Sequence, residues 1–372
     1  MHSYTNICIR LPLGRENRLE LASVHYRHVI EAMTKVDREL KPMWPQHLQK
    51  AIFDIKGLPP PLQLTSGNDL GGLERSLHAY CAAFKVQVPS WTIEWNTPSQ
   101  PAFRLLPPAS QPYSTLQLLA LFRALRYNSY FKELSFRNID LSGLAGKKDF
   151  SHFGDTIAYT SLNGVKISEE HYDLLMQSSV LSQEIHALAF SSESIRSMDL
   201  RNILGPRSIV GRSKDPEGVR RVSSEVLRPI LLLLKRQACL CHSITMSGNL
   251  IAPNDIEELA NLLVLDEVYM KKLDFSNCGL GDEGLTTLWT GIPGQGANLQ
   301  HIDTSENQGT VKFEIIRDSL SQLQAIRKLN IAGNTRIPYN VPLFEDYVLN
   351  SWRLEELDLS GIAVSKHLLR SS

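Results

Sequence analysis

The most restrictive feature of the sequence is a nine-residue pattern that recurs at a nearly constant interval in its C-terminal part. Apolar residues occupy positions 1, 4 and 6, and asparagine, cysteine or an aliphatic residue occupies position 9. The clearest copies are CHSITMSGN, MKKLDFSNC, LQHIDTSEN, IRKLNIAGN and LEELDLSGI, which begin at Cys241, Met270, Leu299, Ile326 and Leu354. Successive copies begin 29, 29, 27 and 28 residues apart. This regularity indicates a chain of stacked units, each of which contacts its neighbours.

The pattern matches the leucine-rich repeat template, in which each unit holds a short strand followed by a helix. Further copies begin at Phe131 and Ile195, and weaker candidates lie around Ile157 and Ile185. We therefore predict the α/β class and a leucine-rich repeat solenoid over residues 116–364. The helices need more room than the strands, so the solenoid should curve into a horseshoe with parallel strands on the concave face and helices on the convex face.

Side-chain alternation assigns the positions of the pattern to faces of the predicted sheet. Positions 4 and 6 point into the core, whereas positions 3, 5 and 7 point outward. We expect burial of Leu273, Phe275, Leu329, Ile331, Leu357 and Leu359, and exposure of Lys272, Asp274, Lys328 and Asp358. At position 9 a buried amide or thiol can bond backbone groups that the turn leaves unpaired, as expected for Asn249, Cys278, Asn307 and Asn334. Ile139, Ile203 and Ile362 should interrupt this ladder.

Two segments that follow copies of the pattern have helical spacing. Residues 281–292 begin with acidic residues and place Leu285, Leu288 and Ile292 on one face. Residues 252–265 have Asn254 or Asp255 as the predicted N-cap. Their predicted inward residues are Ile256, Leu259, Leu262 and Leu263.

The ends of the chain divide into regions of different composition. Residues 1–65, with helical spacing between Val24 and Leu40, form a separate N-terminal region. Residues 66–115 form the predicted cap of the solenoid, with a helix over residues 70–86, an edge strand in SWTIEWN and a proline-rich linker that cannot continue the sheet. Residues 365–372 form a short tail. Because little chain follows the last pattern, we expect the protein either to continue past Ser372 or to dock this end against a partner or another copy.

An insertion is predicted at about residues 205–222, where the pattern skips more than one interval. The segment is rich in glycine, proline and arginine, which is typical of a solvated loop. The alternative is a basic docking or phosphorylatable loop, because Arg207 and Arg212 alternate with Ser208 and Ser213.

Composition limits the partners and the compartment. Lysine and arginine balance aspartate and glutamate at 39 each, so no nucleic-acid partner is expected. The five cysteines are irregularly spaced, which favours a reducing, cytoplasmic compartment. Cys239, Cys241 and His242 lack a second ligand pair, so we expect neither a metal nor another cofactor.

One region resembles a known family. The helix in residues 73–86, the tryptophan-bearing strand WTIEWN, the helical segment LQLLALFRALRYNSYFKEL and above all YNSYFKEL, residues 127–134, resemble the entry to the leucine-rich domain of CARMIL proteins. The resemblance implies a ribonuclease-inhibitor-like horseshoe and a role in actin organisation at membranes, with peripheral membrane association through a partner or the N-terminal region. It also implies that residues 1–65 contain the end of a pleckstrin-homology unit. The family's segment that binds capping protein lies beyond the repeats, so that activity transfers to no residue here.

The sequence contains none of the common nucleotide, metalloprotease or hydrolase motifs, so we predict a protein that is not an enzyme. A scaffold that binds protein partners on the concave face is the leading hypothesis. The alternative is a GTPase activator of the Ran type, for which Arg137 and Arg201 are the available arginines although no acidic tail follows. The predicted partner-binding residues on the concave face are Glu133, Arg137, Asp199, Arg201, Lys272, Asp274, His301, Asp303, Lys328, Asn330, Glu356 and Asp358.

Overall fold

The computed structural model describes residues 70–126, 128–146, 157–159, 161, 165–204, 215–310, 313–334 and 352–361, two N-terminal strands and the single positions 28 and 32. The two strands, β1 (Asn6–Arg10) and β2 (Glu16–Glu20), pair antiparallel. Most of the predicted N-terminal region and all of the predicted tail, with Ile362, lie outside the described residues, as do Arg207, Ser208, Arg212 and Ser213 of the predicted loop.

A nine-stranded sheet runs through the described part of the chain, and its strands lie in the order in which they occur in the sequence. The antiparallel pair β3 (Trp91–Glu94) and β4 (Ala102–Leu105) begins the sheet. All later strands are parallel to their neighbours. They are β5 (Glu133–Ser135), β6 (Ser197–Asp199), β7 (Ser243–Thr245), β8 (Lys272–Asp274), β9 (His301–Asp303), β10 (Lys328–Asn330) and β11 (Glu356–Asp358).

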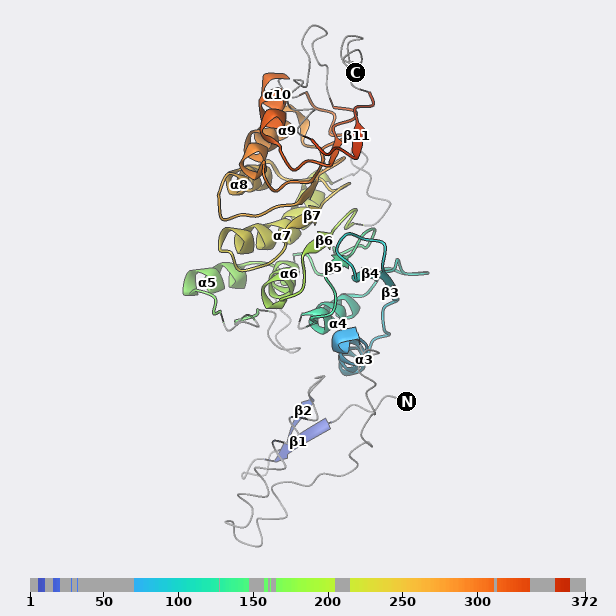
Figure 1. The fold of residues 1–372 in the computed structure, drawn as a ribbon. Coiled ribbons are helices and arrows are strands. Elements are labelled where there is room, and N and C mark those ends of the chain that lie inside the picture. The colour runs from blue at the N-terminus through green and yellow to red at the C-terminus, as the bar shows by residue number, and fades with distance from the viewer. Residues whose placement is uncertain are drawn as a thin grey trace.

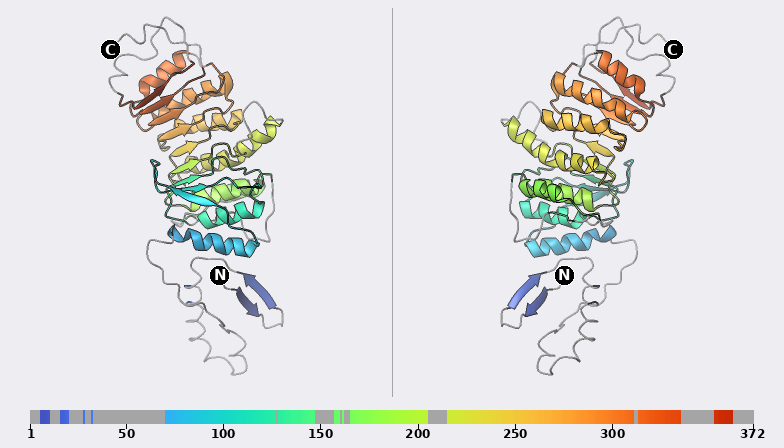
Figure 2. Two further views of the ribbon diagram at one scale, coloured as in Figure 1. Left: turned by 90° about the vertical axis from the view of Figure 1, so that its right-hand side faces the viewer. Right: turned by 90° about the vertical axis from the view of Figure 1, so that its left-hand side faces the viewer.

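Helices cover one face of this sheet, as Figures 1 and 2 show. They are α3 (Leu73–Phe84), α4 (Thr115–Leu125), α5 (Glu169–Gln177), α6 (Val180–Ser191), α7 (Pro216–Lys235), α8 (Pro253–Leu263), α9 (Gly281–Gly291) and α10 (Phe313–Gln322), with 3-10 turns η2 (Leu70–Gly72) and η4 (Ile292–Gln295). We call the opposite side of the sheet the open face. The fold is therefore α/β, with a mostly parallel sheet whose strands alternate with helices. Among these helices, none is both long and apolar enough to cross a bilayer.

Each of the seven strands β5–β11 occupies positions 3–5 of a predicted pattern, so these strand predictions are confirmed. Their central residues pair in register, in the order Leu134, Met198, Ile244, Leu273, Ile302, Leu329 and Leu357. They are almost completely buried, apart from Leu357. Leu357 is 43 % exposed and Leu359 is half-buried, so the predicted burial is wrong there. Both belong to the last described strand unit, beyond which no described strand packs.

The predicted ladder of position-9 side chains is present. Asn249 accepts a hydrogen bond from the Ile203 amide and donates to the Leu200 and Met246 carbonyls. Asn307 and Asn334 make the same kind of bonds, and the Cys278 thiol lies 3.3 Å from the Met246 carbonyl oxygen. Ile139 and Ile203 are buried apolar residues that interrupt the ladder. These amides bond the turn that follows each strand to the neighbouring turn.

The weaker strand prediction around Ile185 is wrong, because Ile185 lies in the middle of α6. The one around Ile157 falls partly on residues 160 and 162–164, which lie outside the described residues. β5 pairs directly with β6, and the chain between them contains α5 and α6. Every residue of α6 is buried, and a segment buried on all sides has no amphipathic period by which its sequence could distinguish a helix from a strand.

Three local predictions are also corrected. The proline-rich linker contains strand β4, because residues 102–105 are free of proline and can donate to a ladder. Residues 216–222 of the predicted loop form the start of α7, which is capped by the Asp215 carboxylate with Pro216 in the first turn. The N-cap of α8 is Ala252, because Asp255 is buried and bonds Ser224 and Arg228 of α7 instead.

Candidate functional site

The open face presents two rows of polar side chains. In the three-residue strands β5–β10 the central side chain is buried in the core, and the register places that of β11 on the same side, so the first and third side chains point to the open face. The first-residue row is Glu133, Ser197, Ser243, Lys272, His301, Lys328 and Glu356. The third-residue row is Ser135, Asp199, Thr245, Asp274, Asp303, Asn330 and Asp358. Thus the structure brings the predicted residues of these strands together on one surface.

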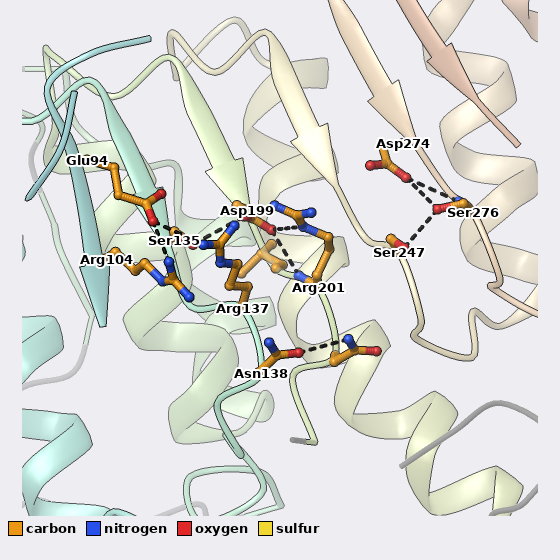
Figure 3. A network of polar contacts seen from close by, with 12 residues as sticks. Glu94, Arg104, Ser135, Arg137, Asn138, Asp199, Arg201, Ser247, Asp274 and Ser276 are labelled. Carbon is orange, nitrogen blue, oxygen red and sulfur yellow. Dashed lines mark hydrogen bonds and ion pairs between the residues drawn. The ribbon is translucent and has the colours of Figure 1, made fainter. Parts of the chain in front are cut away.

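Near the start of the sheet the predicted charges are paired (Figure 3). Arg201 donates to both carboxylate oxygens of Asp199, at 2.8 and 2.6 Å, and the Ser135 hydroxyl donates at 3.2 Å. Burial alone would raise the pKa of Asp199, but the bonds from Arg201 outweigh it and hold that pKa below its ordinary value. Arg137 donates to a carboxylate oxygen of Glu94 at 3.0 Å, and Arg104 donates to the same oxygen at 2.5 Å.

A second pair lies at the other end of the first-residue row. The Lys328 ammonium is 2.5 Å from the Glu356 carboxylate; the Lys328 side chain is half-buried and that of Glu356 is exposed. The Asp358 carboxylate accepts a bond from the Ser360 amide at 2.9 Å. These local bonds lower the pKa of both Glu356 and Asp358. Exposed pairs of this kind contribute little to stability, and solvent remains in contact with them.

Four charged or ionisable side chains occupy the middle of the open face without forming an ion pair to any described residue. Lys272 and His301 are neighbours in the first-residue row, and Asp274 and Asp303 are neighbours in the third-residue row. We call these four residues the central quartet. Asp274 accepts from the Ser276 amide and lies 2.9 Å from the Ser276 hydroxyl, while Asp303 accepts from Ser305 and Asn330. Hydrogen bonds from neutral groups therefore orient the carboxylates, and only the more distant charge of Lys272 partly offsets that of Asp274.

Electrostatics within the quartet follow from this geometry. Burial raises the pKa of Asp274, and the neighbouring Asp303 raises it further. Burial lowers the pKa of His301 to about 4, helped by Lys272 and Lys328 on its two sides. His301 is therefore neutral at pH 7 and can donate or accept a hydrogen bond. Glu133, three strands from Lys272, has its pKa raised by burial and by Asp199.

The predicted exposure of this surface is partly wrong. Asp274 is only 8 % exposed, although it faces away from the apolar core, and Lys272 and Lys328 are half-buried. Only Asp358 is exposed as predicted. Neighbouring strands stand about 4.8 Å apart, so side chains in the same row cover one another from both sides. An interior carboxylate such as Asp274 is covered more than one on the last strand.

Some residues of the surface were absent from the predicted set. Glu94 and Arg104 come from β3 and β4, which the sequence assigned to a cap and a linker. The serines at position 7, Ser247, Ser276, Ser305 and Ser360, could have been found because four patterns share them. Ser276 connects Asp274 to Ser247 at 2.8 Å between the hydroxyls (Figure 3).

In the described residues, no group of three or more histidine, cysteine, aspartate or glutamate side chains has the geometry to hold a metal ion. The quartet can instead provide donors in one row and acceptors in the next, which is the chemistry of recognition. No protein-family model matches the chain, and no curated protein matches it either.

Proposed function

We propose that the chain is a ribonuclease-inhibitor-like leucine-rich repeat protein that acts as a non-enzymatic scaffold and binds a protein partner on its open face. The constant spacing of the pattern and the registered strands support the repeat class. The resemblance to CARMIL proteins suggests a cytoplasmic role in actin organisation at membranes, and this link depends on the resemblance alone.

The central quartet carries the proposal. Lys272 and His301 lie next to each other in the first-residue row, and Asp274 and Asp303 lie next to each other in the third-residue row. Hydrogen-bond donors are therefore in one row and acceptors in the other. Burial raises the pKa of Asp274 most, and the neighbouring Asp303 carboxylate raises it further, so the two carboxylates disfavour each other's charge. A basic side chain of a partner placed between them removes this repulsion, and an acidic side chain of the same partner can reach Lys272. Such patterned charges give an interface its specificity and its orientation.

The remaining predicted residues have a supporting role in this proposal. Glu133, Asn330, Asp358 and the paired residues Arg137, Asp199, Arg201, Lys328 and Glu356 extend the polar surface on both sides of the quartet. Their intramolecular bonds hold side chains in place before binding, which lowers the entropy lost when a partner docks.

A charge swap tests the proposal. Lys272→Glu/Asp303→Lys keeps the net charge and reverses the pattern of the quartet, and Glu257→Lys/Arg221→Glu makes the same exchange on exposed helix positions. Partners captured from cell extract by the wild-type chain and identified by mass spectrometry should be lost with the quartet swap and retained with the helix swap. Equal capture by both folded variants would place the binding surface elsewhere.

The Ran-type GTPase activator remains the alternative from another functional class. In the structure Arg137 and Arg201 both donate to carboxylates, which holds them on the sheet. We expect no acceleration of GTP hydrolysis by Ran or other small GTPases. Acceleration that disappears in Arg137→Ala would establish the alternative and overturn the scaffold proposal.

A further inference from the structure

A third row of residues, distinct from the two rows of the open face, lies where the strands begin. The residue immediately before each strand donates its amide to the carbonyl of the equivalent residue on the previous strand: Arg196 to Lys132, His242 to Arg196, and Lys271 to His242, at 2.7 to 2.9 Å. These four residues therefore lie side by side, one on each of four consecutive strands. We call them the basic edge, and none of them belongs to the open-face rows.

The positive charges of the basic edge have no anionic partner among the described residues. The Arg196 guanidinium donates to the carbonyls of Glu193 and Ile195, and the Lys271 ammonium lies over the ring of Tyr269, 5.5 Å from its centroid. Lys132 is exposed and makes no ion pair with the described residues. Burial lowers the pKa of His242, and the nearby charges of Lys271 and Arg196 lower it further.

Two exposed apolar side chains adjoin this row. Leu240 and Tyr269 occupy equivalent positions in successive helix-to-strand loops and are 47 % and 45 % exposed. The His242 ring meets the Tyr269 ring edge to face, with centroids 5.9 Å apart. Val264 and Leu265, in the same loop as Tyr269, are also exposed. The exposed Tyr269 ring thus lies against His242 and Lys271 of the basic edge, and Leu240 occupies the equivalent position before the previous strand.

We propose that the basic edge binds an acidic, extended peptide segment of a protein partner, with an apolar side chain of that segment resting on Leu240 and Tyr269. Four strands at about 4.8 Å spacing span about 14 Å. That length matches about four or five extended residues. Carboxylates at alternate positions of such a segment reach the cations, and the apolar residue is buried between them.

The surrounding charges favour a peptide over a larger polyanion. Glu193, Asp266 and Glu267 are exposed in the helix-to-strand loops of this edge. A membrane surface or a nucleic acid would bring further negative charge against these carboxylates. A short peptide with few charges can follow the row between them. This inference goes beyond the proposed open-face function because it uses a different surface.

The test measures fluorescence anisotropy of a labelled peptide with glutamates at alternate positions around one central phenylalanine, and of the same peptide with glutamines. We expect saturable binding of the glutamate peptide only. Arg196→Glu/Lys271→Glu should weaken it about tenfold or more. Tyr269→Ala should weaken it several-fold. The matched double reversal Lys166→Glu/Arg221→Glu, at exposed positions elsewhere, should leave the affinity unchanged.

Three results would overturn the inference. The first is that the glutamate peptide shows no saturable binding. The second is that the two double reversals weaken peptide binding equally. The third is that the chain binds phosphatidylserine vesicles or single-stranded RNA through Arg196 and Lys271 but does not bind the peptide. The variant Asp303→Lys separates this proposal from the open-face function. It should reduce capture of the open-face partner while leaving peptide affinity within about twofold, because Asp303 lies in the third-residue row.

Discussion

At the scale of single residues, the buried asparagines at the strand-following turns join neighbouring turns through both ends of their amide. Asn307 is almost fully buried and accepts bonds from the amides of Cys278 and Leu280, at 2.8 and 3.3 Å. Its amide nitrogen donates to the carbonyls of Phe275 and Thr304, at 2.9 and 2.8 Å. One side chain therefore satisfies backbone groups from two consecutive turns.

Asn307→Leu removes these bonds and leaves buried backbone groups without partners. Each such group costs roughly 1 to 3 kcal/mol, so we expect a loss of about 2 to 4 kcal/mol in the free energy of unfolding. Urea denaturation measures it, with Asn254→Ala on an exposed position of α8 as the control. Equal stability of the two variants would show that water replaces the amide.

A pair of buried histidines should make the stability of the protein depend on pH. His171 of α5 and His186 of α6 are almost fully buried, with ring centroids 4.6 Å apart and edge to face. Burial lowers the pKa of His186 to about 3, with contributions from His171, Arg126 and Arg236. Burial and Arg236 lower the pKa of His171 to about 4. Glu184 next to them on α6 is bonded by Arg123 and Arg126.

Because both folded pKa values lie below the ordinary value of 6.5, the unfolded chain binds protons more readily than the folded chain below pH 6.5. The contribution of the two neutral histidines to the free energy of unfolding is complete above pH 6.5 and decreases as the pH falls towards 4. We expect a loss of about 1 to 2 kcal/mol per histidine between pH 7.5 and pH 5. Urea unfolding at both pH values should show a smaller loss in His171→Leu/His186→Leu. An unchanged loss would assign the effect to other groups, of which His242 and His301 also have lowered pKa values.

The sequence could predict which side chains share the open face, but it could not predict which of them pair. Spacing assigns Lys272 and Asp274 to rows, because alternation depends only on the backbone. Pairing depends on rotamers and on residues from other strands, as with Glu94 and Arg137 or Arg201 and Asp199. Burial of Asp274 likewise results from neighbours on both sides. The sequence therefore predicted the twelve residues but not that Lys272, Asp274, His301 and Asp303 lack an ion pair to the described residues.

At the scale of elements, strands β5–β11 were predictable because a short alternating pattern recurs at a constant interval. The predictions failed where the interval changed. Between β5 and β6 the chain contains α5 and α6, and the buried Ile185 satisfied a strand template by chance. Asp255 was a reasonable N-cap by residue type, but its bonds to Ser224 and Arg228 depend on the packing of α7 against α8.

Equivalent leucines in adjacent strands allow a matched comparison at this scale. Leu329 and Leu357 pair directly between β10 and β11, but Leu329 is 1 % exposed and Leu357 is 43 % exposed. Leu329→Ala should lower the free energy of unfolding by about 2 to 5 kcal/mol, because it removes buried contacts and leaves a cavity. Leu357→Ala should cost less than about 1 kcal/mol. Equal losses in chemical denaturation would mean that Leu357 is covered in solution.

At the scale of the whole molecule, charge varies along the strand direction. The basic edge lies where the strands begin, the first-residue row is mixed, and the third-residue row carries four aspartates. This polarity exists although the chain as a whole has no net charge. Two partners, or two segments of one partner, can therefore be distinguished by charge on adjoining surfaces.

The C-terminal end of the described sheet is a candidate surface for self-association. β11 is its outermost strand, and outer strands present backbone groups that can pair with another chain. The exposed Leu357 lies in the middle of this strand and adds apolar area. We expect the protein to self-associate through β11 as concentration rises, and Leu357→Lys to weaken this association. Light scattering over a concentration series measures it, with Val264→Lys, an exposed apolar position after α8, as the control. A wild-type chain that remains monomeric throughout, or equal weakening by both substitutions, would contradict association through this strand.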